Sequence, residues 1–256
     1  MATVFNEFPA ERSAFINPKD TTEPVPGFPE VCVTTFSADI IEQFKELHRP
    51  KVIASLYTSN GILPVYEACH SGKTVGLFLS RVGAPACAAG LEEVIAMGAK
   101  KLVLFGCCGV LDQETVGDKV IIPSSAVRDE GTSYHYLPAS EEIQADPRSV
   151  GMLKSCFERL NVPCTVGKVW TSDAIYRETR SQIAARKAQG CLAVEMECAA
   201  ALAVAQFREI PLFAFLFGAD CLDSPSWEQR DLVDYGIKRG GRFLALALEC
   251  AAELSL

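Results

Sequence analysis

The stretch "CLAVEMECAAALAVAQF", residues 191–207, places two carboxylates, Glu195 and Glu197, in an otherwise apolar run. In a continuous helix, residues two apart point roughly 200° apart, so at most one of these acids would face the core. In an extended segment, residues two apart share a face. We therefore predict that "LAV" is extended, that residues 196–207 form a helix, and that the two acids straddle the junction.

These acids need hydrogen-bond donors if they are buried, and no lysine or arginine lies close to them in the sequence. A carboxylate is acceptor-only, so it can take hydrogen bonds from the neighbouring hydroxyls of a sugar. The alternative is that one acid sits at the helix N-terminus, where the helix dipole favours it, while the other is solvated. The motif indicates either a sugar-diol site or a charged helix terminus.

Short apolar runs, often β-branched, surround this motif and predict strands at 31–35, 52–57, 75–80, 102–105, 119–122, 165–169 and 212–217. Helix-forming segments fall between several of them, at 86–97, 147–160, 181–188, 196–207 and 232–254. This alternation indicates a mostly parallel sheet with helices on both faces. Three prolines in residues 21–30 mark residues 1–30 as an extended arm, leaving one domain over residues 31–256.

The composition of the 256 residues, 49% hydrophobic and 22% charged, is typical of a globular chain. A net charge of -8 without a clustered basic surface argues against a nucleic-acid partner. No run reaches the ~18 apolar residues of a membrane span, and residues 1–30 lack the pattern of a signal peptide. We expect a cytoplasmic protein that does not bind membranes. Eleven cysteines without a C-x-x-C pair and three scattered histidines indicate reduced thiols and no metal site.

Two loops after expected strands contain glycine: "SRVGAPA" (80–86), with Gly83, and "LFGCCGV" (104–110), with Gly106 and Gly109. Sheets of this kind bind ligands at the carboxyl ends of their strands, where glycine lets backbone N–H groups approach an anion. The loops indicate a phosphate site, and the alternative is that these glycines are ordinary turn residues.

Asp220 ends the apolar strand in "FAFLFGADC" (213–221), where a parallel sheet exposes catalytic groups. A partly desolvated carboxylate there would have a raised pKa and could donate a proton, with Arg230 holding its orientation. The alternative is that Asp220 or Asp223 caps a turn. Two further segments, "RDEGTSYHY" (128–136) and "WTSDAIYRETR" (170–180), combine aromatic rings with polar groups, as in walls that bind a planar base or in ordinary surface loops.

Together these segments resemble the family of purine nucleoside phosphorylases, uridine phosphorylases and methylthioadenosine/S-adenosylhomocysteine nucleosidases. The resemblance runs from about Val31 to the C-terminal helix and rests on "VGAPACAAGLEEVIAMGAKKLVLFGCCGVL", "VRDEGTSYHYLP", "TSDAIY", "VEMECAA" and "GAD". It implies an α/β fold, a single-domain three-layer α/β/α sandwich whose central mixed sheet is partly barrel-like. It also implies a homo-oligomer, dimer or hexamer, that breaks a C1'–N glycosidic bond through an oxocarbenium-like state.

The resemblance implies that Glu197 binds the ribose 2'-hydroxyl, that Met196 packs against the sugar and that Glu195 lines the same pocket. Asp220 matches the acid that protonates a purine base at N7. The middle segments look more like those of uridine phosphorylases. The implied base-binding residues are Ser172, Asp173, Tyr176 and Arg177. We expect phosphate to bind at Gly83, Gly106 and Cys107 of the two glycine loops and at Arg81 beside them.

The chain departs from the family where phosphate binds. The family's Gly-Asp-Pro-type loop and following arginine are replaced by "TTFSADII" (34–41), and Leu104 and Cys107 stand where the family has Arg and Ser or Thr. The uracil-reading Gln-x-Arg is replaced around "YRETR" (176–180). A dianion needs compensating donors, and Arg81 is the expected substitute, with Arg128 or Arg177 as others. We expect a phosphorylase that takes a nucleoside and phosphate as co-substrate and uses no cofactor. The alternatives are a nucleosidase that uses water and a non-catalytic nucleoside-binding protein.

Overall fold

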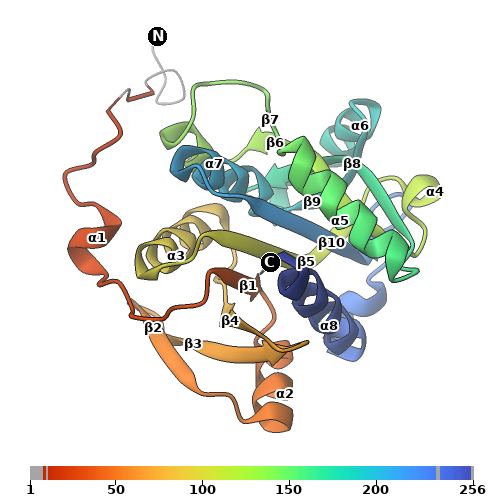
Figure 1. Cartoon of the computed structure of the whole chain (residues 1–256). Helices are drawn as coiled ribbons and strands as arrows, with labels where there is room; N and C mark the ends of the chain where they lie inside the picture. Colours follow the sequence, from red (N-terminus) through yellow and green to blue (C-terminus); the bar gives the residue numbers. More distant parts are fainter. Residues whose placement is uncertain (1–7, 10, 235–236, 255–256) are drawn as a thin grey trace.

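The computed structural model describes residues 8–9, 11–234 and 237–254 (Figure 1). Its strands are β1 (Val31–Thr35), β2 (Val52–Thr58), β3 (Gly61–His70), β4 (Lys73–Leu79), β5 (Lys101–Val110), β6 (Val120–Asp129), β7 (Glu142–Gln144), β8 (Cys164–Ser172), β9 (Cys191–Glu195) and β10 (Leu212–Cys221). Its α-helices are α1 (Pro18–Thr21), α2 (Ala38–His48), α3 (Ala84–Met97), α4 (Gln113–Val116), α5 (Pro147–Arg159), α6 (Arg180–Ala188), α7 (Cys198–Arg208) and α8 (Ile237–Leu254). All seven predicted strands and five predicted helices are present, with shifted ends.

The strands form one sheet in the order β10-β6-β8-β9-β5-β1-β4-β3-β2, and β10 also pairs with β5. That extra pairing closes β10, β6, β8, β9 and β5 into a ring, so the prediction of a partly barrel-like sheet is confirmed. The predicted mixed sheet is confirmed: among the described residues five strand pairs are parallel, and five are antiparallel, namely β2–β3, β3–β4, β5–β9, β6–β7 and β6–β10. The expectation of mostly parallel pairing thus holds for half of these pairs. The turn from β3 to β4 explains one antiparallel pair, because Ser71 and Gly72 both have positive φ, as a tight antiparallel hairpin requires.

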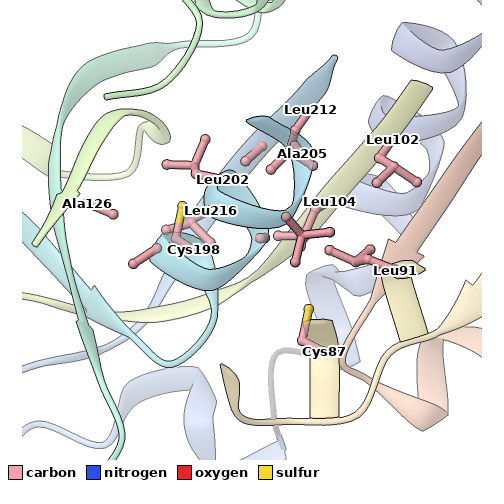
Figure 2. Close-up of a cluster of buried hydrophobic side chains, with 14 of the residues drawn as sticks. Cys87, Leu91, Leu102, Leu104, Ala126, Cys198, Leu202, Ala205, Leu212 and Leu216 are labelled. Carbon is pink, nitrogen blue, oxygen red and sulfur yellow. The ribbon is translucent and has the colours of Figure 1, made fainter. Parts of the chain in front are cut away.

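Helices cover both faces of the sheet, which confirms the three-layer sandwich. On one face α3 and α7 pack on Leu102, Leu104 and Leu216, and Figure 2 shows Cys198, Leu202 and Ala205 of α7 in this cluster. On the other face α2, α5 and α8 contribute to a second cluster with Val103, Phe105 and Phe215. Successive residues of β5 enter opposite clusters, as the two-residue period of a strand requires.

Five elements were not predicted: the short helices α1 and α4, the helix α2, the strand β3 and the short strand β7. The start of α2 carries a recognisable signal, because the Ser37 hydroxyl accepts a hydrogen bond from the backbone N–H of Ile40. The predicted helix at 232–254 is observed as α8 after a 3-10 turn at Arg230–Asp234, and residues 235–236 lie outside the described residues.

The N-terminal arm runs along α3 and contains α1 (Figure 1). Its backbone is tied to the domain where the N–H of Val25 donates to the carbonyl of Met97 at 3.0 Å. The predicted boundary between arm and domain at residue 30 stays a prediction. Over the part of the chain that the structure describes, no helix is long and apolar enough to cross a membrane.

Candidate active site

Glu195 and Glu197 lie where β9 passes into α7, so the predicted strand-to-helix junction is confirmed. The Oε2 atom of Glu195 accepts hydrogen bonds from the backbone N–H groups of Glu197 and Cys198, both at 2.6 Å. Its Oε1 atom accepts one from the Thr171 hydroxyl at 2.5 Å. Protein donors therefore hold both oxygens of Glu195, which gives this acid a structural role at the first turn of the helix.

Glu197 points instead to the loop before α3. Its Oε1 atom accepts a hydrogen bond from the backbone N–H of Gly83 at 2.6 Å, and the residue is 6% exposed. Burial raises the pKa of Glu197 to about 7. Burial, together with the charge of Glu197, raises the pKa of Glu195 to about 8. A carboxyl whose pKa lies near 7 can hold a proton or accept hydrogen bonds from hydroxyls. Of the two acids this fits Glu197, because protein donors already hold both oxygens of Glu195.

Asp220 lies in β10 opposite Gly109, just after an irregularity in the strand between Gly218 and Asp220. Such bulges re-aim side chains and occur beside active sites. A Cβ on Gly109 would lie 3.3 Å from Oδ1 of Asp220 and 2.5 Å from Cδ1 of Leu222. Glycine at this position therefore avoids a steric clash with the residues around the Asp220 carboxyl. Burial raises the pKa of Asp220, as a proton donor requires.

The partner that orients Asp220 is Trp227, not Arg230 as predicted. The indole Nε1–H of Trp227 donates to Oδ2 of Asp220 at 2.7 Å. The guanidinium of Arg230 donates to Glu228 and to Gln113. Arg230 thus pairs with the carboxylate of Glu228, two residues away, instead of with Asp220. The positive charge of Arg230 lowers the pKa of Asp220 only weakly.

Cys107 lies on β5, the strand that pairs with both β9 and β10, near whose ends the two acids lie. Burial, and then the charges of Asp220 and Glu197, raise the pKa of its thiol to about 11. The sheet register brings the two acids together: Gly109 of β5, two residues after Cys107, pairs with Asp220 of β10 and with Val194 of β9, three residues before Glu197. Glu197 and Asp220 therefore lie near the same part of β5, which includes the predicted residue Cys107.

The structure adds Glu178, which the sequence interpretation missed. Burial raises the pKa of Glu178 to about 7, opposed by a hydrogen bond with Ser172, and the charges of Asp220 and Asp129 add to the rise. Glu178 comes directly after the 3-10 turn Ile175–Arg177, which follows the end of β8 at the predicted Ser172. Its signal in the sequence is weak: it is the one acid in "YRETR", in a segment already singled out for base binding.

The remaining predicted base residues divide into two groups. Oδ2 of Asp173 accepts a hydrogen bond from the N–H of Gly131 at 3.1 Å, and Asp173 lines a cavity together with Met196 and Gly83. Tyr176 is 96% exposed, and Arg177 beside it is also exposed. In this chain Tyr176 and Arg177 therefore face solvent, because a 3-10 turn at Ile175–Arg177 carries them outward.

That cavity has a volume of about 1070 Å³ and extends from Gly83 and Met196 along α3 to the N-terminal arm. The arm is fastened beside it by Arg12, whose guanidinium lies 3.1 Å from Glu209 and stacks over the ring of Phe207. The arm therefore forms one wall of the space in front of the predicted sugar site.

The predicted phosphate residues are not arranged as an open anion site. The N–H of Gly83 is bonded to Glu197, and a Cβ on Gly106 would lie 2.8 Å from Cδ2 of Phe36. Leu104 is buried in the apolar cluster of Figure 2. Arg81 is half-buried, and its charge lowers the pKa of Glu93 and of Cys87 against the effect of burial.

Arg128, the second candidate for binding phosphate, donates its hydrogen bonds to the segment that follows it in the chain. Its guanidinium donates to the hydroxyls of Ser133 and Ser140 and to the carbonyls of Leu137 and Pro138. It also stacks on the ring of Tyr134, 3.9 Å from the centroid. A guanidinium with its donors used in this way orders the segment that lines the cavity and is not a phosphate ligand.

Known proteins share both the sequence pattern and the fold. A profile of the phosphorylase superfamily matches residues 30–250. Guanosine phosphorylase of Halorubrum lacusprofundi is 26% identical over 157 residues, 60% of this chain and 64% of that protein. Uridine phosphorylase of Treponema pallidum is 29% identical over 153 residues, 56% of this chain and 59% of that protein. Purine nucleoside phosphorylase of Plasmodium falciparum is 27% identical over 216 residues, 80% of this chain and 86% of that protein. The match thus spans under two thirds of the first two relatives.

Solved structures share the architecture. Uridine phosphorylase from Vibrio fischeri superimposes with a TM-score of 0.74 at 20% identity, over 90% of this chain and 95% of that one. AMP nucleosidase from Bacteroides thetaiotaomicron superimposes with a TM-score of 0.71 at 19% identity, over 90% of each chain. At these identities the likeness is one of fold. The profile match covers most of the chain, and the chain belongs to the phosphorylase superfamily.

Proposed function

We propose that the protein is an enzyme that cleaves the N-glycosidic bond of a ribonucleoside. The observation that carries this proposal is that the sheet brings two buried carboxyls with raised pKa to the same part of β5: Gly109 pairs with Asp220 and with Val194, three residues before Glu197. Glycosidic bond cleavage needs one group to hold the sugar and another to protonate the leaving group. This pair of acids is placed to supply both.

In the proposed reaction, Glu197 accepts a hydrogen bond from the ribose 2'-hydroxyl and Met196 packs against the sugar. The C1'–N bond breaks and its electron pair goes to the base nitrogen, which takes a proton from the Asp220 carboxyl. An acceptor oxygen forms the new bond to C1'. The proton that the acceptor loses passes to solvent, from which Asp220 is protonated again.

The acceptor has two candidates. Inorganic phosphate, the co-substrate expected from the sequence, is supported by the names of the relatives and by Arg81 beside the Gly83 loop. Water is favoured by a specific observation: the ring of Phe36 lies against Gly106, where an anion was expected. Neither reaction needs a cofactor or a metal ion.

The base side of the proposed site is formed by Asp220, Glu178, Ser172 and Asp173. A carboxylate at Glu178 would accept N–H groups from the edge of a base, as guanine, hypoxanthine and uracil all offer. The raised pKa of Asp220 suits protonation of a purine at N7. We therefore propose a 6-oxopurine nucleoside as the first substrate to test and uridine as the second.

We also propose that the enzyme acts as a homo-oligomer, a dimer or a hexamer. Four apolar side chains, Val82, Ile175, Tyr176 and Trp227, are 52–96% exposed in segments adjoining the site, as expected for surfaces covered by another subunit. Light scattering after size-exclusion chromatography measures this directly, and a monomer would contradict it. The cytoplasmic location stays a prediction from the sequence.

The test of function uses the purified full chain with guanosine, inosine, adenosine and uridine, each with and without phosphate. Chromatography measures the free base, and separate assays distinguish ribose from ribose 1-phosphate. We expect base release from at least one nucleoside. Tight nucleoside binding without base release in any condition would overturn the proposal in favour of a binding protein.

A further inference from the structure

Phe36 occupies the carboxyl edge of the sheet beside the site. It follows β1 directly, and β1 lies between β4 and β5 with Thr35 opposite both Leu79 and Phe105. The next position along β5 is Gly106. A Cβ on Gly106 would lie 2.8 Å from Cδ2 and 3.2 Å from Cε2 of Phe36, so the ring fills the space that the missing side chain leaves.

Two backbone donors at this edge are also engaged. The N–H of Gly83 donates to Glu197, and the N–H of Ser80 donates to the carbonyl of Thr35 at 2.8 Å. The hydroxyl of Ser37 accepts from the N–H of Ile40 at the start of α2. A phosphate ion needs several N–H or cationic donors at once, and here it would meet the aromatic ring and hydrogen bonds already formed.

The charges around this edge also disfavour a dianion. Glu197 accepts the N–H of Gly83 at this edge, and Asp220 pairs in register with Gly109, three residues after Gly106. Each of these carboxyls repels a phosphate when it is ionised, and the face of an aromatic ring carries partial negative charge. Water is neutral and small, and it needs none of the donors that phosphate requires.

We propose that Phe36 selects the acceptor, excluding phosphate from the Gly106 edge so that water attacks C1'. This inference rests on the proposed N-glycosidic cleavage. The water oxygen bonds to C1', the bond to the base nitrogen breaks, and Asp220 protonates the departing base. The proton released by water goes to solvent, and the products are free base and ribose.

The test compares the wild type with Phe36→Ala and Phe36→Leu. Phe36→Ala removes the ring, whereas Phe36→Leu keeps an apolar side chain over Gly106. Phe28→Ala is the matched control, because Phe28 also packs against a glycine, Gly98, away from the site. Turnover is measured with and without phosphate, and binding of inorganic phosphate alone is measured by calorimetry.

We expect wild type, Phe36→Leu and Phe28→Ala to release ribose at rates that phosphate changes by less than about twofold. Phe36→Ala should bind phosphate at least about tenfold more tightly than the wild type and form ribose 1-phosphate. Phosphate binding to the wild type as tight as to Phe36→Ala, or wild-type production of ribose 1-phosphate, would overturn the inference. If no variant cleaves any nucleoside, the proposed function fails, and the calorimetry still decides whether Phe36 excludes phosphate.

Discussion

On the carboxylate side of the site each acid has its own protein donor, whereas on the glycine side the Gly83 N–H and the space over Gly106 are already occupied. Glu197 is held by the N–H of Gly83, and Asp220 by the indole of Trp227. On the glycine side, the same N–H of Gly83 is thereby engaged and Gly106 is covered by Phe36. This difference supports the proposed roles of the two acids in holding a sugar and protonating a base, and the proposed exclusion of a free dianion.

The largest effect should come from Glu197→Ala, which removes the acceptor for the ribose hydroxyl. We expect turnover to fall about 10³-fold, because a charged hydrogen bond made to the sugar during bond cleavage is lost. Glu197→Gln, which keeps an oxygen for the Gly83 N–H, should lose activity with little change in melting temperature. Glu158→Ala, an exposed acid on α5, is the control. Normal turnover in Glu197→Ala would remove the ribose assignment.

Asp220→Asn tests the proposed proton donor on the base side of the site. Asparagine keeps an oxygen for the Trp227 indole but has no acidic proton, so we expect the rate to fall about 10²-fold. Steady-state kinetics with a purine nucleoside measure this loss. Asp223→Asn is a matched control three residues away, where the carboxylate binds Lys187 and the N–H of Gln113. Equal losses in the two variants would argue against a proton donor at position 220.

Trp227→Phe tests the role of Asp220 through the pH dependence of the rate. The indole hydrogen bond lowers the pKa of Asp220 against the effect of burial, so its removal raises that pKa further. Since the protonated acid is the active form, the rate falls as pH rises through this pKa, and the alkaline limb should move to higher pH. We expect the rate at the optimum to fall about tenfold through poorer orientation. Trp170→Phe, at the other indole–carboxylate pair, should leave the limb in place. A shift to lower pH in Trp227→Phe would contradict this role.

Arg81→Ala should have the smallest effect. Arg81 lies two residues before Gly83, and with water as acceptor its loss should change the rate by less than about twofold. Titration of activity against phosphate concentration measures the outcome. A steep rise in the phosphate requirement would show instead that Arg81 holds a phosphate acceptor.

Sequence patterns predicted the features that depend on local spacing. The two-residue separation of Glu195 and Glu197 predicted their junction, and the apolar run before Asp220 predicted its place at a strand end. The partners were not predictable in this way, because Gly83 and Glu197, or Phe36 and Gly106, meet only when the sheet is assembled. Sequence reasoning predicted Arg230 as the partner of Asp220 because its side chain is oppositely charged. The indole of Trp227 reaches Asp220 only through the path of the chain after β10, which the sequence pattern does not indicate.

The most direct measurement is the sugar product formed by the wild-type enzyme from guanosine or inosine, with phosphate absent and then present. The account predicts free base in both conditions, with ribose as the sugar. Base release that requires phosphate and yields ribose 1-phosphate would contradict the account of the glycine side. The absence of base release from any nucleoside would contradict the central claim that Glu197 and Asp220 cleave an N-glycosidic bond.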